Sequence, residues 1–505
     1  SILDNVDSGL DLPNELCPVC NSEMRKDGHA IPFETFLGFK GDKVPDIDLN
    51  FSGDYQPIIH EYIREIFGVD RTFRAGTIST VADRTAFGYV KGFLEKKNIQ
   101  IRKAEIERIA SNITGVKRST GQHPGGIVVV PNYKDIIDVT PVQYPADDID
   151  SLWRTTHFDY HSFEDNLFKL DVLGHDDPTM IRYLMDYVAI NPIEFPFSNA
   201  VDIPLDDPEV YRLLNSTDVI GLSHEDLNSS VASFGIPEMG TNFVRGMLKD
   251  SRPKTFADIV KISGLSHGTD VWNNNAKDLV LGKNVQFGKI PFNEVIGCRD
   301  DILVYLIENG MDQAVAFEIA EFVRKGKPSK DKLKWEGYKI IMRKAKIPDW
   351  YIWSCGKIKY MFPKAHATAY VMMALRIAWF KLYKPILFYS AYFSKRASDF
   401  DVYAFTGGEY TVMKRMNEID EKGRSATETE KRLYTVLEIA NEMLKRGFTF
   451  SPIDVNLSEA RNFKIGADKK SLILPFITVD GLGLKVANSI VDARNESEFK
   501  SKDDV

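Results

Sequence analysis

Two acidic residues near the start of the chain have the types and spacing to bind a divalent cation. Asp46 and Asp48 lie in the otherwise largely apolar stretch from Val44 to Phe51. If this stretch is a strand, its side chains alternate between two faces, so both carboxylates point the same way, roughly 7 Å apart. Like charges at that spacing repel each other unless a cation lies between them, and Mg²⁺ binds oxygen ligands together with substrate phosphates. The open alternative is a surface hairpin whose outer face is acidic.

A second stretch, from Asn166 to Gly174, adds a third carboxylate and a cation. A strand period of two places Lys169 and Asp171 on one face and apolar residues on the other. Three carboxylates on two strands suit a pair of metal ions, one activating a hydroxyl and the other holding a leaving phosphate. Lys169 would then neutralise triphosphate charge beside them. Taken alone, Lys169 and Asp171 also fit a plain cross-strand or solvated pair.

A glycine-rich segment, residues 117–126, lies in the sequence between the two acidic stretches. It contains two cations, two hydroxyl groups, His123 and three glycines, directly before an apolar strand expected at Ile127–Val130. Glycine permits close backbone approach, and basic and hydroxyl groups suit phosphate. We therefore expect a phosphate-binding loop with His123 as a contact, although glycine-rich loops without such a role are common.

Positive charge gathers in one part of a chain whose net charge is −8. Residues 252–387 hold 23 Lys and Arg against 13 Asp and Glu, and residues 324–346 hold ten against two. Basic segments inside an acidic protein are typical of nucleic-acid or polyphosphate binding. Lys325 and Lys327 flank Gly326 in a turn expected to break a helix and to project its cations. The alternative is a solvated, lysine-rich helix face.

Three further polar groupings surround the basic run. Each by itself is better explained as a loop or a helix cap, but together they suggest a helical domain that closes over an anionic ligand. A cation near a helix N-terminus is well placed for this, because the backbone N–H groups there also favour anions. The candidates are Ser266 and His267 in segment 263–270, Arg299 in segment 297–301, and Lys364 and His366 at the start of a helix expected to end before Pro385.

The elements that must position these groups are a mixture of helices and strands. The composition, 43% hydrophobic and 27% charged, is that of an ordinary folded protein, and 505 residues predict several domains. Neither a signal peptide nor a membrane-spanning segment is expected, and four cysteines in so long a chain favour a reducing cytoplasm. Hydrophobic periodicity predicts helices at 56–67, 79–95, 103–114, 208–214, 432–446 and 485–493, and a strand and turn at 73–77.

Cys17 and Cys20 form a Cys-Pro-Val-Cys turn that is half of a zinc knuckle. Structural zinc usually has four ligands, whereas the other two cysteines lie far along the chain and His29 is at no standard spacing. We expect the missing pair to precede residue 1 in a longer protein, and we favour this half-site over a redox-active pair. The chain as given is expected to bind Zn²⁺ poorly or not at all.

Six motifs occur in a fixed order along the chain. They are Pro45-Asp46-Ile47-Asp48-Leu49-Asn50-Phe51, Gly121-Gln122-His123-Pro124-Gly125-Gly126, Lys169-Leu170-Asp171-Val172-Leu173-Gly174, the segment from Ser263 to Trp272, Gly297-Cys298-Arg299-Asp300-Asp301 and Pro363-Lys364-Ala365-His366. In this order the chain closely resembles the catalytic core of bacterial DNA polymerase III alpha subunits, specifically the PolC type. The resemblance spans nearly the whole chain, and six ordered motifs make it very specific.

The resemblance implies an α+β multidomain protein with a palm of the polymerase beta-like nucleotidyltransferase kind. It implies that Asp46, Asp48 and Asp171 bind two Mg²⁺ ions, and that large helical fingers bind the incoming nucleotide, with Arg299 as the first cation to carry over. The expected parts are a segment linked to the zinc knuckle and thumb at 1–40, the palm at 41–205, the fingers at 206–395, a helical linker at 396–450 and the start of a helix-hairpin-helix domain at 451–505.

The expectation for the last part rests on the turn Gly481-Leu482-Gly483, which directly precedes a predicted helix. In a helix-hairpin-helix element the backbone N–H groups of such a turn bind DNA phosphates without reading sequence. An ordinary helix start is the alternative, and position within the family favours the DNA-binding interpretation.

The resemblance implies template-directed DNA synthesis in chromosome replication, in which dNTPs are added to a primer 3′ end and pyrophosphate is released. The implied partners are primer–template DNA, dNTP and, in the full-length protein, a sliding clamp and other replisome subunits, in the cytoplasm and without a membrane. Upstream regions of the family are absent from the given chain, so a non-catalytic DNA-binding remnant is one alternative. A template-independent nucleotidyltransferase with the same carboxylates is the other.

Overall fold

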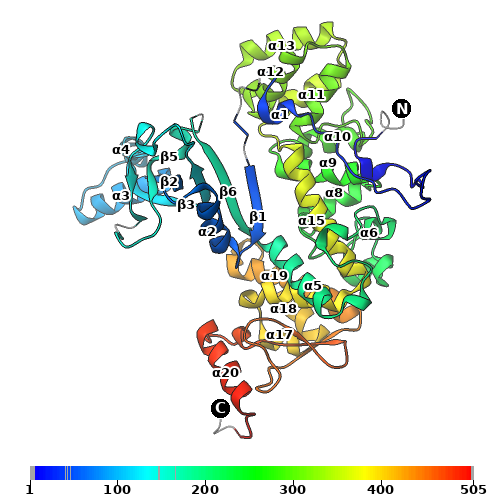
Figure 1. The fold of residues 1–505 in the computed structure, drawn as a ribbon. Helices are drawn as coiled ribbons and strands as arrows, with labels where there is room; N and C mark the ends of the chain where they lie inside the picture. Colours follow the sequence, from blue (N-terminus) through cyan, green and yellow to red (C-terminus); the bar gives the residue numbers. More distant parts are fainter. Residues whose placement is uncertain are drawn as a thin grey trace. The chain divides into compact units, whose positions relative to one another are not determined.

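The chain forms two compact units (Figure 1). The computed structural model describes residues 6–39, 41, 44, 45, 47–145, 148–164 and 166–501, apart from the side chain of Ser398. One unit, which we call the sheet unit, is Phe36–Pro178, and the other, the helical unit, combines Ser1–Thr35 with Thr179–Val505. Over the described residues, neither unit has a helix long and apolar enough to cross a membrane. The predicted mixture of helices and strands is confirmed.

A six-stranded mixed sheet organises the sheet unit, in the order β1-β6-β3-β2-β5-β4. The parallel pairs are β1 with β6 and β2 with β5, while β3 runs antiparallel to both β6 and β2. Both predicted acidic strands therefore exist, and they are neighbours. The strands are β1 (Ile47–Ser52), β2 (Thr72–Thr80), β3 (Lys117–Val129), β4 (Val142–Gln143), β5 (Thr155–Asp159) and β6 (Phe168–His175).

Apolar side chains cover much of both faces of this sheet. On one face, Ile63 of helix α2 (Gln56–Phe67) packs with Ile127, Leu170 and Val172. The opposite face buries a second cluster that includes Phe73 and Val128. Because β6 alternates, its apolar residues face α2 while Lys169 and Asp171 face the other way. Helices α3 (Asp83–Lys96) and α4 (Lys103–Ser111) build a small core of their own, so the three helices predicted in this region are confirmed.

The composition of the glycine-rich segment at residues 117–126 predicted a loop, and this prediction is wrong. The segment is the first part of strand β3. It pairs with β2, which extends past the turn expected at Thr77; Thr77 lies opposite Gly121. The glycines serve close packing within the sheet instead. A Cβ on Gly125 would lie 2.5 Å from the carbonyl oxygen of Val172, and one on Gly126 would lie 2.9 Å from Cβ of Ala75. Long-range strand pairing has therefore overridden the local turn signal.

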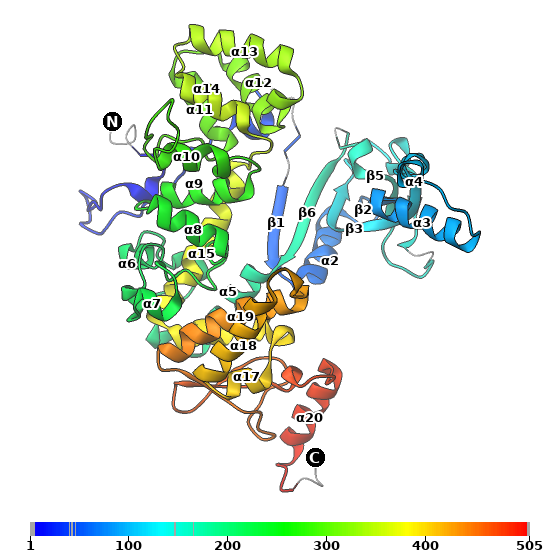
Figure 2. The same ribbon diagram turned by 180° about the vertical axis from the view of Figure 1, so that it is seen from behind.

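The helical unit is built around α15 (Lys364–Tyr383), which packs along α9 (Phe256–His267) (Figures 1 and 2). α15 also contacts α16 (Pro385–Lys395). One large apolar cluster runs through the unit. Two helices, α1 (Glu34–Leu37) and α5 (Asp176–Ile190), lie where the chain passes between the units. The other helices are α6 (Pro208–Arg212), α7 (His224–Leu227), α8 (Asn242–Ser251), α10 (Lys277–Val280), α11 (Arg299–Glu308), α12 (Gln313–Arg324), α13 (Lys332–Lys344), α14 (Asp349–Lys357), α17 (Val402–Thr406), α18 (Glu409–Lys422) and α19 (Glu428–Lys445).

Several helix ends are where the sequence predicted them. The side chain of Asp207 caps α6, and α15 ends before Pro385. α12 stops at Arg324, and Gly326 follows with a φ of 64°, a left-handed conformation that glycine adopts without strain. Segment 263–270 is the end of a helix, since α9 continues through His267 and Gly268 is its C-cap, so the alternative of a helix cap is confirmed and that of a loop is not.

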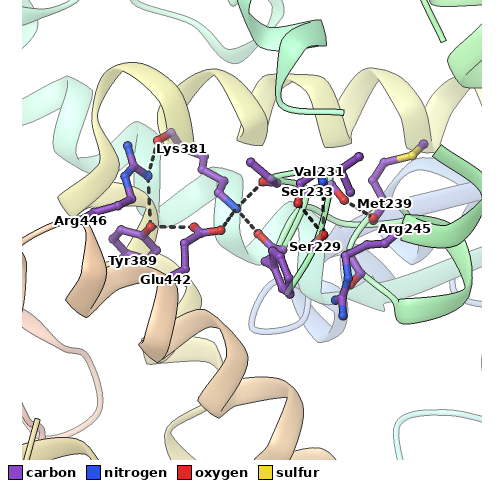
Figure 3. Close-up of polar contacts among 12 residues, drawn as sticks. Ser229, Val231, Ser233, Met239, Arg245, Lys381, Tyr389, Glu442 and Arg446 are labelled. Carbon is purple, nitrogen blue, oxygen red and sulfur yellow. Dashed lines mark hydrogen bonds and ion pairs between the residues drawn. The ribbon is translucent and has the colours of Figure 1, made fainter. Parts of the chain in front are cut away.

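A buried ion pair fixes a long loop onto the centre of the helical unit (Figure 3). Lys381 of α15 is fully buried, and its ammonium donates to the carbonyls of Ala232 and Phe234 at 2.7 and 2.5 Å and to Glu442 of α19 at 2.8 Å. Tyr389 completes the network by donating to Glu442 at 2.7 Å. Two of the ammonium's three hydrogen bonds thus hold the loop at residues 229–240, which carries Glu238 toward α9, and the third joins α15 to α19.

The last part of the helical unit contains a small sheet and a final helix. The sheet has the order β7-β9-β8, with strands β7 (Thr449–Ser451), β8 (Lys464–Ile465) and β9 (Ser471–Ile473). The turn at Gly481 leads into α20 (Leu484–Glu496), with Gly483 at its N-cap. The helix predicted at residues 485–493 is confirmed.

Candidate active site

Asp48 of β1 and Asp171 of β6 lie directly opposite each other in the parallel pair of strands. Residues in register on neighbouring strands point to the same face, and the strands are about 4.8 Å apart. Asp48 is exposed, whereas Asp171 is buried, with 8% of its surface accessible. The structure thus brings two of the three predicted carboxylates together. Asp46, the third, lies outside the described residues.

Lys169 neutralises one oxygen of Asp171. Its Nζ lies 2.6 Å from Oδ2 of Asp171, with both side chains largely buried. The ammonium also stands over the ring of Tyr160, 4.6 Å from the centroid. The pair forms within one strand, because residues two apart share a face. Lys169 is therefore beside the carboxylates, as predicted; whether it contacts phosphate stays a prediction.

The other oxygen of Asp171, Oδ1, is buried and has no hydrogen-bond partner among the described residues. Its neighbour is Nδ1 of His123, at 3.5 Å. That nitrogen accepts the backbone N–H of Gly126 at 2.7 Å, so it carries no proton to donate. Burial lowers the pKa of His123 and outweighs the opposing effect of Asp171, which raises it. The net lowering of the pKa favours the neutral ring. A buried carboxylate oxygen without a donor is costly unless a cation completes it.

The donor set fits a divalent metal ion. Asp48 and the unpartnered oxygen of Asp171 are the hard oxygen ligands that Mg²⁺ prefers. Asn50, on the same face of β1 as Asp48, adds a buried side-chain carbonyl oxygen that likewise lacks a partner within the described part of the chain. No cluster of three acidic, His or Cys side chains suited to a metal occurs among the described residues, which do not include Asp46.

Arg74 and Gln56, which sequence reasoning missed, hold the part of strand β3 that carries His123. Arg74 Nη2 donates to the carbonyls of His123 and Pro124 at 3.1 and 3.0 Å. Gln56 Nε2 donates to the same Pro124 carbonyl at 3.2 Å and to that of Val172 at 2.7 Å. An arginine within the apolar strand Phe73–Ala75 was the available signal for this role.

In the helical unit, predicted residues from three distant stretches gather around Phe362. His267 stacks on the Phe362 ring at 4.7 Å, and His366 meets its edge at 4.5 Å. The backbone N–H of Arg299 donates to the Phe362 carbonyl at 3.3 Å. Asp300 accepts the N–H of Lys364 at 2.7 Å and so joins the starts of α11 and α15. His267 also contacts Glu238 of the anchored loop.

Arg299, the first predicted nucleotide-binding cation, lies between two carboxylates. It is only 7% exposed, and its Nη2 and Nη1 lie 3.2 Å from Asp300 and 3.5 Å from Glu321. Arg324 and Lys325 contact the same Glu321. Sequence reasoning did not select Glu321, although its spacing of three and four residues from these two cations on one helix was a readable signal.

The remaining phosphate-binding candidates are less closely joined to this cluster. The hydroxyl of Ser266 donates to the carbonyl of Ser263 in its own helix at 2.8 Å. Lys327 is exposed at the start of a short 3-10 turn after Gly326. Lys364 Nζ lies 3.8 Å from Asp301. Although burial raises the pKa of Asp301, Lys261, Lys364 and two backbone N–H groups outweigh that effect and hold it below its usual value.

Cys17 and Cys20 occupy the tight turn that was predicted as half of a zinc knuckle. The N–H of Cys17 donates to the Ser22 carbonyl at 2.7 Å, and the Asn21 N–H donates back to the Cys17 carbonyl at 2.9 Å. Hydrogen bonds, chiefly from Ser22, lower the pKa of Cys20 to about 7. Among the described residues, no third acidic, His or Cys side chain lies where it could complete a metal-binding cluster with the pair. Zinc binding stays a prediction.

Three parts of the chain match known protein families. Residues 15–103 and 88–174 match the bacterial DNA polymerase III alpha NTPase domain, and residues 177–346 match the bacterial DNA polymerase III alpha subunit finger domain. Residues 447–505 match a helix-hairpin-helix motif.

Curated relatives match the chain along almost its whole length. The DNA polymerase III PolC-type of Lacticaseibacillus paracasei is 55% identical over 500 residues, which cover 99% of this chain and 33% of the relative. That of Oceanobacillus iheyensis is 55% identical over 501 residues, with 99% and 34% covered. The Lactococcus lactis protein is 55% identical over 499 residues, with 98% and 29% covered. The chain thus spans about one third of the length of these relatives.

Proposed function

This chain belongs to the PolC-type DNA polymerase III alpha subunits, and we propose that it performs their template-directed DNA synthesis. In this reaction a primer 3′-hydroxyl attacks the α-phosphate of a dNTP, and pyrophosphate leaves. The observation that supports this most is the placement of Asp48 opposite Asp171, whose Oδ1 is buried and lacks a partner within the described residues. A charged oxygen kept without a donor is best explained by a cation that binds there.

In this proposal the sheet unit is the palm domain, of the polymerase beta-like nucleotidyltransferase kind. Asp46, Asp48 and Asp171 would hold two Mg²⁺ ions, which when bound lower the pKa of the primer hydroxyl and stabilise the charge of the leaving pyrophosphate. Lys169 binds Oδ2 of Asp171 and thereby holds the carboxylate in an orientation that leaves Oδ1 available to a cation. His123 remains neutral and does not compete for that oxygen.

The helical unit supplies the fingers. Arg299, Lys325, Lys327 and Lys364 provide positive charge for the triphosphate of the incoming dNTP, because charge stabilisation and positioning do most of the work in phosphoryl transfer. The ring cluster of His267, Phe362 and His366, in which only His267 stacks on Phe362, offers aromatic surfaces near Arg299 and Lys364 for the base. Pairing with the template base, not side chains, would select the nucleotide.

The helix-hairpin-helix region would hold DNA. The turn at Gly481 and the N–H groups at the start of α20, which have no side-chain cap among the described residues, are suited to backbone phosphates. In the full-length protein, a sliding clamp and other replisome subunits would be further partners, in the cytoplasm, where chromosome replication takes place in bacteria.

Primer extension with all four dNTPs on a defined template tests this proposal. The chain should extend the primer in template order with Mg²⁺, while Asp48→Asn and Asp171→Asn should lower the rate at least a thousandfold and leave primer–template binding intact. Asp70→Asn is the control in the same unit, since Asp70 pairs with Arg154 at the surface. Addition without regard to template would indicate a template-independent transferase instead, and DNA binding without extension would indicate a non-catalytic remnant.

A further inference from the structure

One carboxylate in the fingers occupies the place of an anion among three cations. Glu321 of α12 accepts two hydrogen bonds from Arg324, at 2.9 Å from Nε and 3.0 Å from Nη2. Lys325 Nζ lies 3.7 Å from Oε2 of Glu321, and Nη1 of Arg299, from α11, lies 3.5 Å from Oε1. Two separate helices thus direct their positive charges at a single carboxylate.

The four contacts differ in strength. Arg324 binds Glu321 through two short, parallel bonds between neighbours on one helix, which is the strong geometry for this pair of groups. The distances from Arg299 and Lys325 are beyond those of good hydrogen bonds. These two cations can therefore exchange Glu321 for another anion at little cost, while Arg324 keeps the carboxylate in place.

The cluster also retains unused capacity for an anion. Only 7% of the surface of Arg299 is exposed, yet its Nε lacks a hydrogen-bond partner among the residues described. Among the described residues of this cluster, three cations face two carboxylates, those of Glu321 and Asp300. A buried donor without an acceptor and an excess of positive charge both favour a further negative ligand.

We propose that Glu321 is a resident counter-ion that competes with polyphosphate for Arg299 and Lys325. The inference rests on the proposed function, because it takes the ligand to be the triphosphate of a dNTP and the product to be pyrophosphate. Without an internal anion, the cations would hold pyrophosphate tightly after each addition. With Glu321 in place, the ligand must displace a carboxylate, so a triphosphate binds reversibly and a single phosphate binds poorly.

Binding of tripolyphosphate to the 505-residue chain, measured by titration calorimetry, tests this inference. Glu321→Gln keeps the size of the side chain and removes its charge, so tripolyphosphate and pyrophosphate should bind about tenfold more tightly. Glu318→Gln is the matched control: it removes the same charge from the same helix, where Glu318 accepts a hydrogen bond from Tyr338 at 3.2 Å, and affinity should stay within about twofold of the original. Equal or weaker binding in Glu321→Gln would overturn the inference.

A double-mutant cycle separates competition from a purely structural role. If Glu321 acts by occupying Arg299, the gain from Glu321→Gln should largely disappear in an Arg299→Gln background. A gain of the same size in that background would contradict the inference. Should Glu321→Gln fold poorly, Glu321→Met preserves side-chain length and helix propensity and carries the same expectation.

The outcome is distinguishable from failure of the proposed function. Template-ordered extension that depends on Asp48, together with unchanged polyphosphate affinity in Glu321→Gln, would leave the polymerase assignment in place and remove the counter-ion. Tighter polyphosphate binding in Glu321→Gln, in a chain that never extends a primer, would support the counter-ion and contradict the polymerase assignment.

Discussion

Lys169 and Asp171 project from the same face of β6, and their charged groups meet at 2.6 Å. The ammonium takes Oδ2, and Oδ1 remains buried with no donor that the structure describes. Lys169 thus determines which oxygen of Asp171 is available to a further ligand. Both oxygens of Asp171 are therefore open to test, Oδ2 through Lys169 and Oδ1 through a bound metal ion.

Replacing Lys169 should impair catalysis more than folding. We expect Lys169→Met to slow single-turnover incorporation about 10²- to 10³-fold, since it removes a charge that orients Asp171 and stands near the predicted phosphate. Lys169→Arg should recover part of the rate, because it restores the charge. Rapid-quench primer extension measures both variants, and an unchanged rate in Lys169→Met would show that the pair is only structural.

Magnesium should stabilise the chain through Asp171 and Asp48. At about ten times its Kd, Mg²⁺ should add about 1.4 kcal/mol to the free energy of unfolding, seen as a rise in the melting temperature that EDTA reverses. Asp171→Asn should lose this rise, whereas Asp70→Asn should keep it. The same rise in Asp171→Asn would place the ion elsewhere.

His60 should make the sheet unit sensitive to acid. Burial, reinforced by the adjacent Arg74, lowers the pKa of His60 to about 4, against about 6.5 in the unfolded chain. Between these values the unfolded state binds more protons, so stability should fall as the pH is lowered from about 6.5 to about 4, by at most about 3 kcal/mol from this residue. His60→Gln should flatten that part of the stability profile measured by urea denaturation; an identical slope in the variant would exclude His60 as its source.

The buried ion pair in Figure 3 should matter most when only one partner is removed. Lys381→Met leaves Glu442 and the carbonyls of Ala232 and Phe234 without their donor, and should cost about 3–5 kcal/mol. The double variant Lys381→Met, Glu442→Leu should recover part of this loss, because no uncompensated charge remains. Urea midpoints followed by circular dichroism give the comparison, and a double variant less stable than the sum of both losses would contradict it.

Local patterns in the sequence were sufficient for many of the elements and for the polar faces of some of them. Alternation predicted that Lys169 and Asp171 share a face, helical periodicity placed α2, and Pro385 and Gly326 marked the ends of α15 and α12. These features depend on neighbours a few residues apart, and the resemblance to the polymerase family rested on the same short motifs.

Contacts between distant residues decided the rest. The sequence does not encode in any local pattern that Asp48 pairs in register with Asp171, that residues 117–126 form a strand beside β2, or that Arg299 meets Glu321 across two helices. Such pairings depend on which surfaces bury each other in the folded chain. The acidic residues could therefore be named from their spacing, but the unpartnered oxygen of Asp171 and the shared carboxylate of Glu321 became visible only in three dimensions.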